Sequence, residues 1–200
     1  MAFRVGLTGG MGSGKTTAAE MLGELGAAVI DTDAISRELS GGRGAAMPAI
    51  RAQFGEEYVA ADGGLARDRM RALVFTNAGA REALEAILHP LIRQESRARV
   101  AAASAPYVVL VVPLLFETGA YADLVQRVVV VDCSEERQVE RATRRSRISA
   151  EEVRAIMASQ LPRSARLARA DDGLDNEGGL GSLRAQVDAL HAKYLELACP

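Results

Sequence analysis

A glycine-rich segment near the start of the chain constrains the fold more than any other feature. Residues 9–16 read Gly-Gly-Met-Gly-Ser-Gly-Lys-Thr, which fits the pattern G-x-x-x-x-G-K-[ST]. The apolar stretch Phe3–Thr8 before it reads as a buried strand, and Lys15–Leu25 after it reads as a helix that Gly26 should end. A glycine-rich turn without a ligand is the alternative, but a phosphate-binding loop requires this order of strand, loop and helix. We therefore expect the loop to bind the phosphates of a nucleotide.

Each part of this loop has an expected task. Residues without a Cβ let the backbone wrap closely around a triphosphate, so that several N–H groups point at it. The positive N-terminal end of the following helix adds to the attraction. The Lys15 ammonium should reach the β- and γ-phosphates, and the Thr16 hydroxyl should bind Mg²⁺. The 24 Lys and Arg residues include only two lysines, Lys15 and Lys193, which indicates that position 15 needs a compact ammonium.

Valine-rich runs further along the chain indicate a parallel sheet. Tyr107–Val112 and Arg127–Asp132 are mostly apolar, as strands are when both faces of a sheet are covered. Shorter strands are expected at Ala28–Asp31 and near Gly173–Asp175. Because strands alternate with helices, the chain should fold as an α/β P-loop NTPase with a doubly wound parallel sheet of about five strands.

The helical segments are expected in three places. Residues 34–105 should be mostly helical, with breaks at 40–44, at 62–64 and at Pro90, which should end or kink a helix. A capping box at 149–152 should open a helix that runs to about Leu161. A last helix is expected from Ser182 to about Leu197, with His191 on its solvated surface.

Length and composition exclude several classes of protein. Two hundred residues suffice for one domain, 1–200, and are too few for two ordinary ones. A net charge of −2 gives no attraction to nucleic acid or to an anionic membrane. No apolar run approaches the roughly 20 residues that span a bilayer, and no signal peptide is evident. Cys133 and Cys199 form no disulfide framework or metal-ligand spacing, so a cytoplasmic protein is expected. The sequence does not determine the oligomeric state, for which we expect a monomer or weak homo-oligomer.

Two aspartates after the second expected strand favour a kinase of small molecules. Asp31 and Asp33 lie at the carboxyl edge of the sheet, where ligands of such folds bind. If the segment is extended, both carboxylates can point to one side, and one of them can face the hydroxyl group of an acceptor. The alternative is that Asp33 only caps the next helix. The chain lacks the N-K-x-D sequence of GTP-binding switches and the acidic pair of motor ATPases.

Several short motifs follow one another in a characteristic order along the chain. They are Leu7–Thr17, Asp31 and Asp33 with Arg37, Phe54-Gly55, Leu88-His89-Pro90, Pro113–Glu117, Gln160, Ala170–Asp172 and Asp175-Asn176. This ordered set resembles the dephospho-coenzyme A kinase family. The resemblance implies a P-loop core, a helical acceptor-binding insertion at about 34–105 and a helical lid. It also implies transfer of the γ-phosphoryl group of ATP to the ribose 3′-hydroxyl of dephospho-coenzyme A, the last step of coenzyme A synthesis.

Residue roles follow from the same resemblance. Asp33 would accept the proton of the ribose hydroxyl, and Lys15 would assist transfer. Alternative explanations remain for His89, as a histidine at a helix kink, and for Leu114 and Phe116, as ordinary core residues. The implied ATP-binding residues are Gly12, Ser13, Gly14, Lys15, Thr16, Thr17, Arg141, Arg145 and Asn176, and the implied acceptor-binding residues are Asp33, Arg37, His89, Arg93, Leu114, Phe116 and Glu117.

An arginine-rich segment, 134–166, is the expected lid. Phosphoryl transfer to a hydroxyl must keep water from the γ-phosphate, so kinases close a mobile element over the nucleotide. Arg141 and Arg145 are four residues apart and share a helix face, from which they could meet phosphates or stack on adenine. A charged surface helix balanced by glutamates is the alternative. The arginines of the segment are Arg137, Arg141, Arg144, Arg145, Arg147, Arg154, Arg163 and Arg166.

Two other functions compete with this interpretation. One is a P-loop kinase of another small metabolite, such as a nucleoside monophosphate or a sugar acid. The other is a regulator that binds ATP without transferring phosphate. Monophosphate kinases need clustered arginines for the acceptor's phosphate, and the acidic region around Asp33 does not obviously supply them. A carboxylate at the acceptor edge argues against the regulator.

Overall fold

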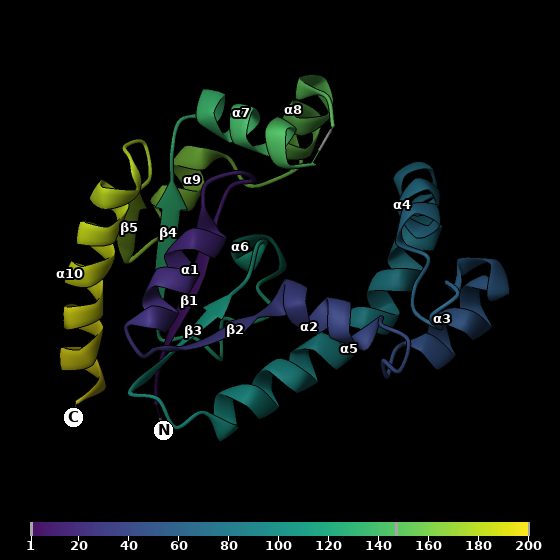
Figure 1. Cartoon of the computed structure of the whole chain (residues 1–200), viewed down its shortest axis with the longest axis horizontal. Coiled ribbons are helices and arrows are strands. Elements are labelled where there is room, and N and C mark those ends of the chain that lie inside the picture. The colour runs from purple at the N-terminus through teal and green to yellow at the C-terminus, as the bar shows by residue number, and fades with distance from the viewer. Residues whose placement is uncertain (1, 147, 200) are drawn as a thin grey trace. The chain divides into compact units, whose positions relative to one another are not determined.

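The computed structural model describes residues 2–146 and 148–199, and over these residues the chain forms a five-stranded parallel α/β sheet (Figure 1). The strand order is β2-β3-β1-β4-β5, so β1 lies at the centre. In register, Leu7 of β1 lies opposite Val111 of β3 and Val129 of β4. The predicted fold class is confirmed. The strands are β1 Phe3–Gly9, β2 Ala28–Asp31, β3 Tyr107–Val111, β4 Arg127–Asp132 and β5 Asp172–Asp175.

The chain divides into two compact units, which we describe separately. The first unit comprises Met1–Ile30 and Val100–Pro200, and the second comprises Asp31–Arg99. Among the helices of the described residues, none is long and apolar enough to cross a membrane. The helices of the first unit are α1 Lys15–Glu24, α6 Leu115–Thr118, α7 Glu135–Ser146, α8 Ala150–Ala158, α9 Arg163–Leu167 and α10 Leu180–Ala198.

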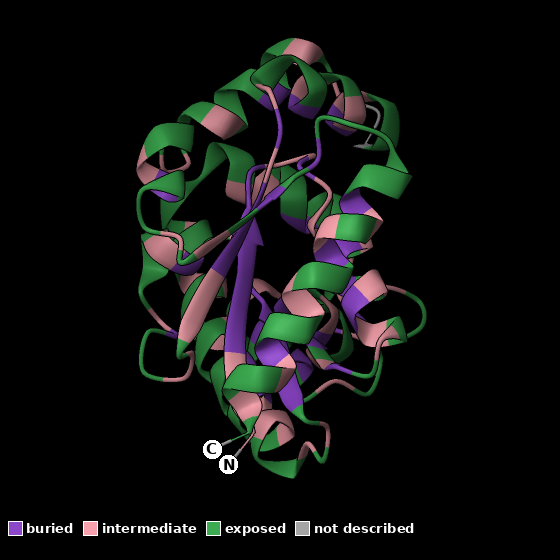
Figure 2. Cartoon of the chain, turned by 90° about the vertical axis from the view of Figure 1, so that its left-hand side faces the viewer, coloured by how far each residue is buried: buried purple, intermediate pink, exposed green. Residues whose placement is uncertain are grey.

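One face of the sheet in the first unit is covered by α1 and α10. Val5 and Leu7 of β1 are fully buried there against Leu22 of α1 and Leu183 and Tyr194 of α10. β3 is buried along its whole length, as its uninterrupted apolar sequence predicts. Buried residues gather on the central strands, and the surrounding helices are exposed on their outer sides (Figure 2). Removal of this much apolar surface from water is the main stabilisation of the sheet.

The second unit is built from helices around a small core of its own. Ala46, Met47, Ile50 and Met70 are its most buried members, and Leu88 packs on them from a long helix. A short antiparallel bridge between Val59 and Leu65 closes the turn at 62–64. The elements are α2 Thr32–Leu39, α3 Met47–Phe54, a 3₁₀ turn Glu56–Tyr58, α4 Arg67–Thr76 and α5 Ala78–Ala102.

The structure decides one local expectation and corrects another. Of the two effects expected of Pro90, ending a helix is excluded, because α5 continues through it. Proline frees the carbonyl four residues before it, and here Ala86 is exposed, so water can satisfy that group. His191 is not merely solvated surface, since its Nδ1 lies 2.8 Å from the hydroxyl of the buried Tyr107.

Candidate active site

The glycine-rich loop joins the end of β1 to the start of α1. Gly12 and Gly14 have φ angles of 75° and 101°, in the region that favours glycine. A Cβ on Gly14 would lie 2.1 Å from the Asn176 Nδ2 atom. That amide is only 7% exposed and donates a 2.7 Å hydrogen bond to the Ser13 carbonyl. Asn176 at the end of β5 therefore supports the loop directly.

Lys15 and Thr16 occupy the first turn of α1. The Lys15 ammonium donates to the carbonyls of Gly9 (2.8 Å) and Gly10 (3.0 Å), so it lies folded over the loop. Thr16 is exposed, and the first turn contains no acidic residue. Among the described residues there is no group of three His, Cys, Asp or Glu side chains that could hold a metal ion.

Two side chains, one from α7 and one from α9, approach Gly10 of the loop. Gln138 of α7 is buried, and its Nε2 donates 3.0 Å to the Cys133 carbonyl. A Cβ on Gly10 would lie 2.1 Å from the Gln138 Oε1 atom and 3.0 Å from the Arg166 Nη1 atom. The Arg166 Nη2 donates 2.8 Å to the carbonyl of Leu161.

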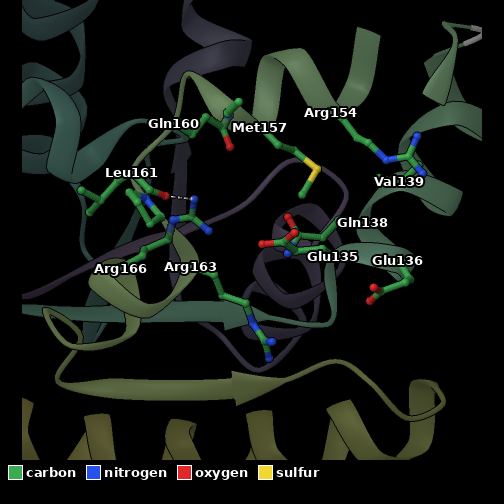
Figure 3. A pocket seen from close by; sticks show the side chains of 12 residues that line it. Glu135, Glu136, Gln138, Val139, Arg154, Met157, Gln160, Leu161, Arg163 and Arg166 are labelled. Carbon is green, nitrogen blue, oxygen red and sulfur yellow. Dashed lines mark hydrogen bonds between the residues drawn. The ribbon is translucent and has the colours of Figure 1, made fainter. Parts of the chain in front are cut away.

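These side chains line a pocket of about 400 Å³ among α7, α8 and α9. Figure 3 shows Arg163 and Arg166 on one side of it, with Gln138 and Glu135 facing them. Arg163 makes a two-pronged ion pair with Asp132, with distances from 2.6 to 3.0 Å. This pocket adjoins the loop through Gln138 and Arg166.

A second hollow, of about 280 Å³, lies beside the start of α1. Arg141 lines it and donates 3.0 Å to the Asn176 carbonyl. Its other nitrogen lies 3.8 Å from the Cys133 Sγ. Burial raises the pKa of the Cys133 thiol, which the nearby Arg141 only partly offsets. Arg145 is exposed further along α7 and does not line this hollow, whose other members are Gly14, Thr17, Asn176 and Gly178–Leu180.

The two aspartates of the second unit differ from expectation. Only Asp31, the last residue of β2, is extended, because α2 begins directly after it at Thr32 and includes Asp33. The Asp31 carboxylate caps the helix by accepting from the backbone N–H groups of Asp33 (2.8 Å) and Ala34 (3.4 Å). The alternative in which Asp33 is the cap is therefore wrong. Asp33 lies exposed in the first helical turn.

The other expected acceptor residues of this unit lie on its surface. Arg37 is exposed on α2, with one nitrogen 4.0 Å from the Asp31 carboxylate. His89 and Arg93 are exposed on α5, four residues apart and thus on one helix face.

The remaining expected acceptor residues lie around α6 in the first unit. Leu114 is exposed, which argues against an ordinary core role for it. The Phe116 ring lies 5.9 Å from the Arg169 guanidinium. The Glu117 carboxylate accepts a 2.9 Å hydrogen bond from the backbone N–H of Leu161.

Sequence reasoning missed Gln138 and the Gly178–Leu180 segment. Helical spacing could have revealed Gln138, because it stands three and seven residues before Arg141 and Arg145, on their face of α7. Nothing in the sequence distinguished Gly178–Leu180 from an ordinary loop. Arg166 was one of eight arginines in the segment, and only its burial distinguishes it.

Comparison with known proteins gives a consistent result. A family model described as dephospho-CoA kinase matches residues 3–182. The dephospho-CoA kinase of Chromobacterium violaceum is 61% identical over 96% of this chain and 94% of that protein. A crystal structure from Thermus thermophilus superposes with a TM-score of 0.81 and 33% identity, covering 96% of this chain and 97% of that one. The dephospho-CoA kinase of Campylobacter jejuni has the same fold, with a TM-score of 0.71, 24% identity and 98% coverage of both chains.

Proposed function

The chain belongs to the dephospho-CoA kinase family, and from this membership we propose how its residues carry out the family's reaction. The enzyme transfers the γ-phosphoryl group of ATP to the ribose 3′-hydroxyl of dephospho-CoA, which gives CoA and ADP. One observation carries the proposal: a loop of the right sequence, between β1 and α1, is supported by buried polar side chains from two other parts of the first unit.

ATP would bind along this loop. Backbone N–H groups of Gly12–Thr17 would hold the phosphates at the N-terminal end of α1, and the Lys15 ammonium would turn from the loop carbonyls to the β- and γ-phosphates. Asn176 would keep the loop in shape, and Arg141 would contact the nucleotide from the second hollow. Arg145 would join it when the lid closes.

Mg²⁺ would accompany ATP. The residues fit a hard cation in one respect: the Thr16 hydroxyl is an oxygen ligand, exposed at the first turn of α1. Bound there, the ion would offset charge on the phosphates. Such ions usually keep several waters and take few ligands from the protein, which agrees with the lack of a carboxylate cluster among the described residues.

On the acceptor side, Asp33 would act as the general base. The ribose 3′-oxygen would bond to the γ-phosphorus while the bond from that phosphorus to the β–γ bridging oxygen breaks, and the hydroxyl proton would pass to the Asp33 carboxylate. Asp31 already serves as the helix cap, so it holds Asp33 at the start of α2. The acceptor would contact Arg37, His89, Arg93, Leu114, Phe116 and Glu117.

The division of labour along the chain is part of the proposal. Residues 34–105 would bind the acceptor, and residues 134–166 would act as the lid. Within that lid, Arg147 lies outside the described residues. We also retain two predictions, a cytoplasmic location and a monomer or weak homo-oligomer. Sedimentation of the purified protein tests the oligomeric state directly.

A substrate panel tests the function. ATP consumption is measured with dephospho-CoA, with nucleoside monophosphates and with sugar acids, each with and without Mg²⁺. The expected result is Mg²⁺-dependent turnover that is fastest with dephospho-CoA. A clear preference for a nucleoside monophosphate or a sugar acid would contradict the acceptor assignment, and ATP binding without turnover would indicate a regulator.

A further inference from the structure

Arg166 is a buried cation that no carboxylate neutralises within the described residues. It is 6% exposed, and its described hydrogen bond goes to a neutral group, the Leu161 carbonyl. Its neighbour Arg163 differs, because Asp132 pairs with it in two-pronged fashion. A charge taken out of water without a counter-charge destabilises the folded protein. The site of Arg166 therefore has the electrostatic character of a binding site for an anion.

The Arg166 guanidinium lies against the phosphate loop. A Cβ on Gly10 would come within 3.0 Å of its Nη1, so only the absence of that atom lets the two approach so closely. Gln138 approaches the same glycine with its Oε1 and is itself held by the Cys133 carbonyl. The guanidinium thus stands at the pocket edge where the loop would present the outer phosphates of ATP (Figure 3).

We propose that Arg166 is the arginine that contacts the γ-phosphate of ATP and stabilises its charge during transfer. This inference rests on the proposed binding of ATP at the loop. A planar guanidinium can donate to the Leu161 carbonyl and to a phosphate oxygen at the same time, which an ammonium cannot match in geometry. The interaction of such a preorganised donor with the phosphate becomes stronger as charge develops in the transition state.

Glu117 is the positioning residue for Arg166. Its carboxylate accepts from the Leu161 N–H (2.9 Å), and the carbonyl of the same Leu161 accepts from Arg166 (2.8 Å). The backbone of Leu161 therefore connects Glu117 on α6 with Arg166 on α9. Because Leu114 and Phe116 beside Glu117 are proposed acceptor contacts, occupation of the acceptor site and placement of Arg166 would be coupled.

The decisive variant is Arg166→Met. Methionine keeps most of the aliphatic volume and removes the unpaired charge, so the melting temperature should stay the same or rise. Turnover of ATP with dephospho-CoA should fall by about 100-fold or more. Binding of a non-hydrolysable ATP analogue should weaken about tenfold or more, while ADP, which has no γ-phosphate, should bind as before. Arg144→Met, at an exposed arginine of α7, is the matched control. It should change neither the turnover nor the affinity for either nucleotide.

The analogue-to-ADP affinity ratio separates this proposal from the proposed function. It needs no acceptor, so it tests Arg166 even if dephospho-CoA proves to be the wrong substrate. Equal weakening of both nucleotides, or turnover within twofold of wild type, would overturn the assignment. If Arg166→Met is poorly folded, Arg166→Lys replaces it, with the charge kept and the same loss of γ-phosphate preference expected.

Glu117 is tested by a pair of variants. Glu117→Ala removes the acceptor of the Leu161 N–H and should lower kcat about tenfold, with the ADP affinity unchanged, because Arg166 is misplaced. Glu117→Gln keeps an oxygen at that position and should restore most of kcat. If the glutamine variant is as impaired as the alanine variant, the hydrogen bond to Leu161 is not what matters.

Discussion

At the scale of single residues, Asp33 is the group on which the chemistry depends most directly. Asp33→Asn keeps the shape and removes the proton acceptor, so kcat should fall by roughly 100-fold or more, within the usual range for a general base. ATP affinity, measured by titration calorimetry, should change little, because the loop is intact. Asp68→Asn, at an exposed carboxylate of α4, is the control. Wild-type turnover by Asp33→Asn at saturating substrate would assign the base elsewhere.

Lys15 allows a second residue-scale prediction, because the chain has one other lysine to compare. Lys15→Ala should lower turnover about 100-fold or more, and Lys15→Arg should be nearly as poor, since a guanidinium does not fit the space over Gly9 and Gly10. Lys193→Arg on α10 keeps an ion pair with Asp172 and should leave turnover unchanged. Steady-state kinetics of the three variants decide the point, and a fully active Lys15→Arg would contradict the argument from lysine usage.

Residue types alone indicated candidate site residues but not always their geometry. The pair Asp31 and Asp33 was evident in the sequence, yet its local conformation was not, because either aspartate could cap the helix and the sequence does not show that α2 begins between them. The importance of Arg166 depends on burial, and no local pattern encodes the burial of one arginine among eight. His191 was misjudged for the same reason, since its partner Tyr107 is 84 residues away.

At the scale of elements, the loop and the helices α7 and α9 form one packed arrangement around Gly10. Gly10→Ala tests it, since the added Cβ would lie 2.1 Å from the Gln138 Oε1 atom. Gln138 and Arg166 must then move away from the loop, and displacement of about 1 Å can cost about 100-fold in turnover. Gly173→Ala in β5, where a Cβ would meet no atom within 4 Å, is the matched control and should stay active. An active Gly10→Ala enzyme would show that this close packing is dispensable.

The elements themselves were largely predictable, for identifiable reasons. The strands β1, β3 and β4 are apolar runs bounded by turn residues, and the capping box of Ser149 and Glu152 does open α8. α8 ends at Ala158 rather than near Leu161, and a separate short helix, α9, follows Pro162. The four-residue helix α6 is too short to show a periodic pattern, so sequence could not reveal it.

At the scale of the whole molecule, a charged network ties the last helix to the sheet. The Asp172 carboxylate of β5 is 5% exposed and accepts from Lys193 (2.6 Å) and Tyr194 (3.0 Å) of α10. Arg127 of β4 pairs with the same carboxylate at 2.5 Å. Burial raises the pKa of Asp172, but the hydrogen bonds from Arg127, Lys193 and Tyr194 outweigh it and lower the pKa overall. The second lysine of the chain is thus a structural one.

This lowered pKa makes part of the stability dependent on pH, with a definite sign. Folding favours the ionised form of Asp172, so its contribution is fully present above the ordinary pKa of the group and is lost as the pH falls through the lower pKa of the folded state. Acid should therefore weaken the attachment of α10 to β4 and β5.

Asp172→Asn tests the network through the free energy of unfolding. At about pH 7 the variant should lose roughly 1–3 kcal/mol, because Arg127 and Lys193 keep partial access to water and so are not left fully buried without a partner. For a chain of this size that corresponds to a decrease in Tm of about 2–12 °C. The difference in free energy of unfolding between variant and wild type, measured by urea denaturation, should shrink as the pH falls below about 4. Protonation of Asp172 then makes the wild-type side chain neutral, like the asparagine of the variant. Asp188→Asn, at an exposed aspartate of α10, should change neither the free energy of unfolding nor its dependence on pH. A difference that stays constant with pH would mean that packing, and not the charge of Asp172, holds the helix in place.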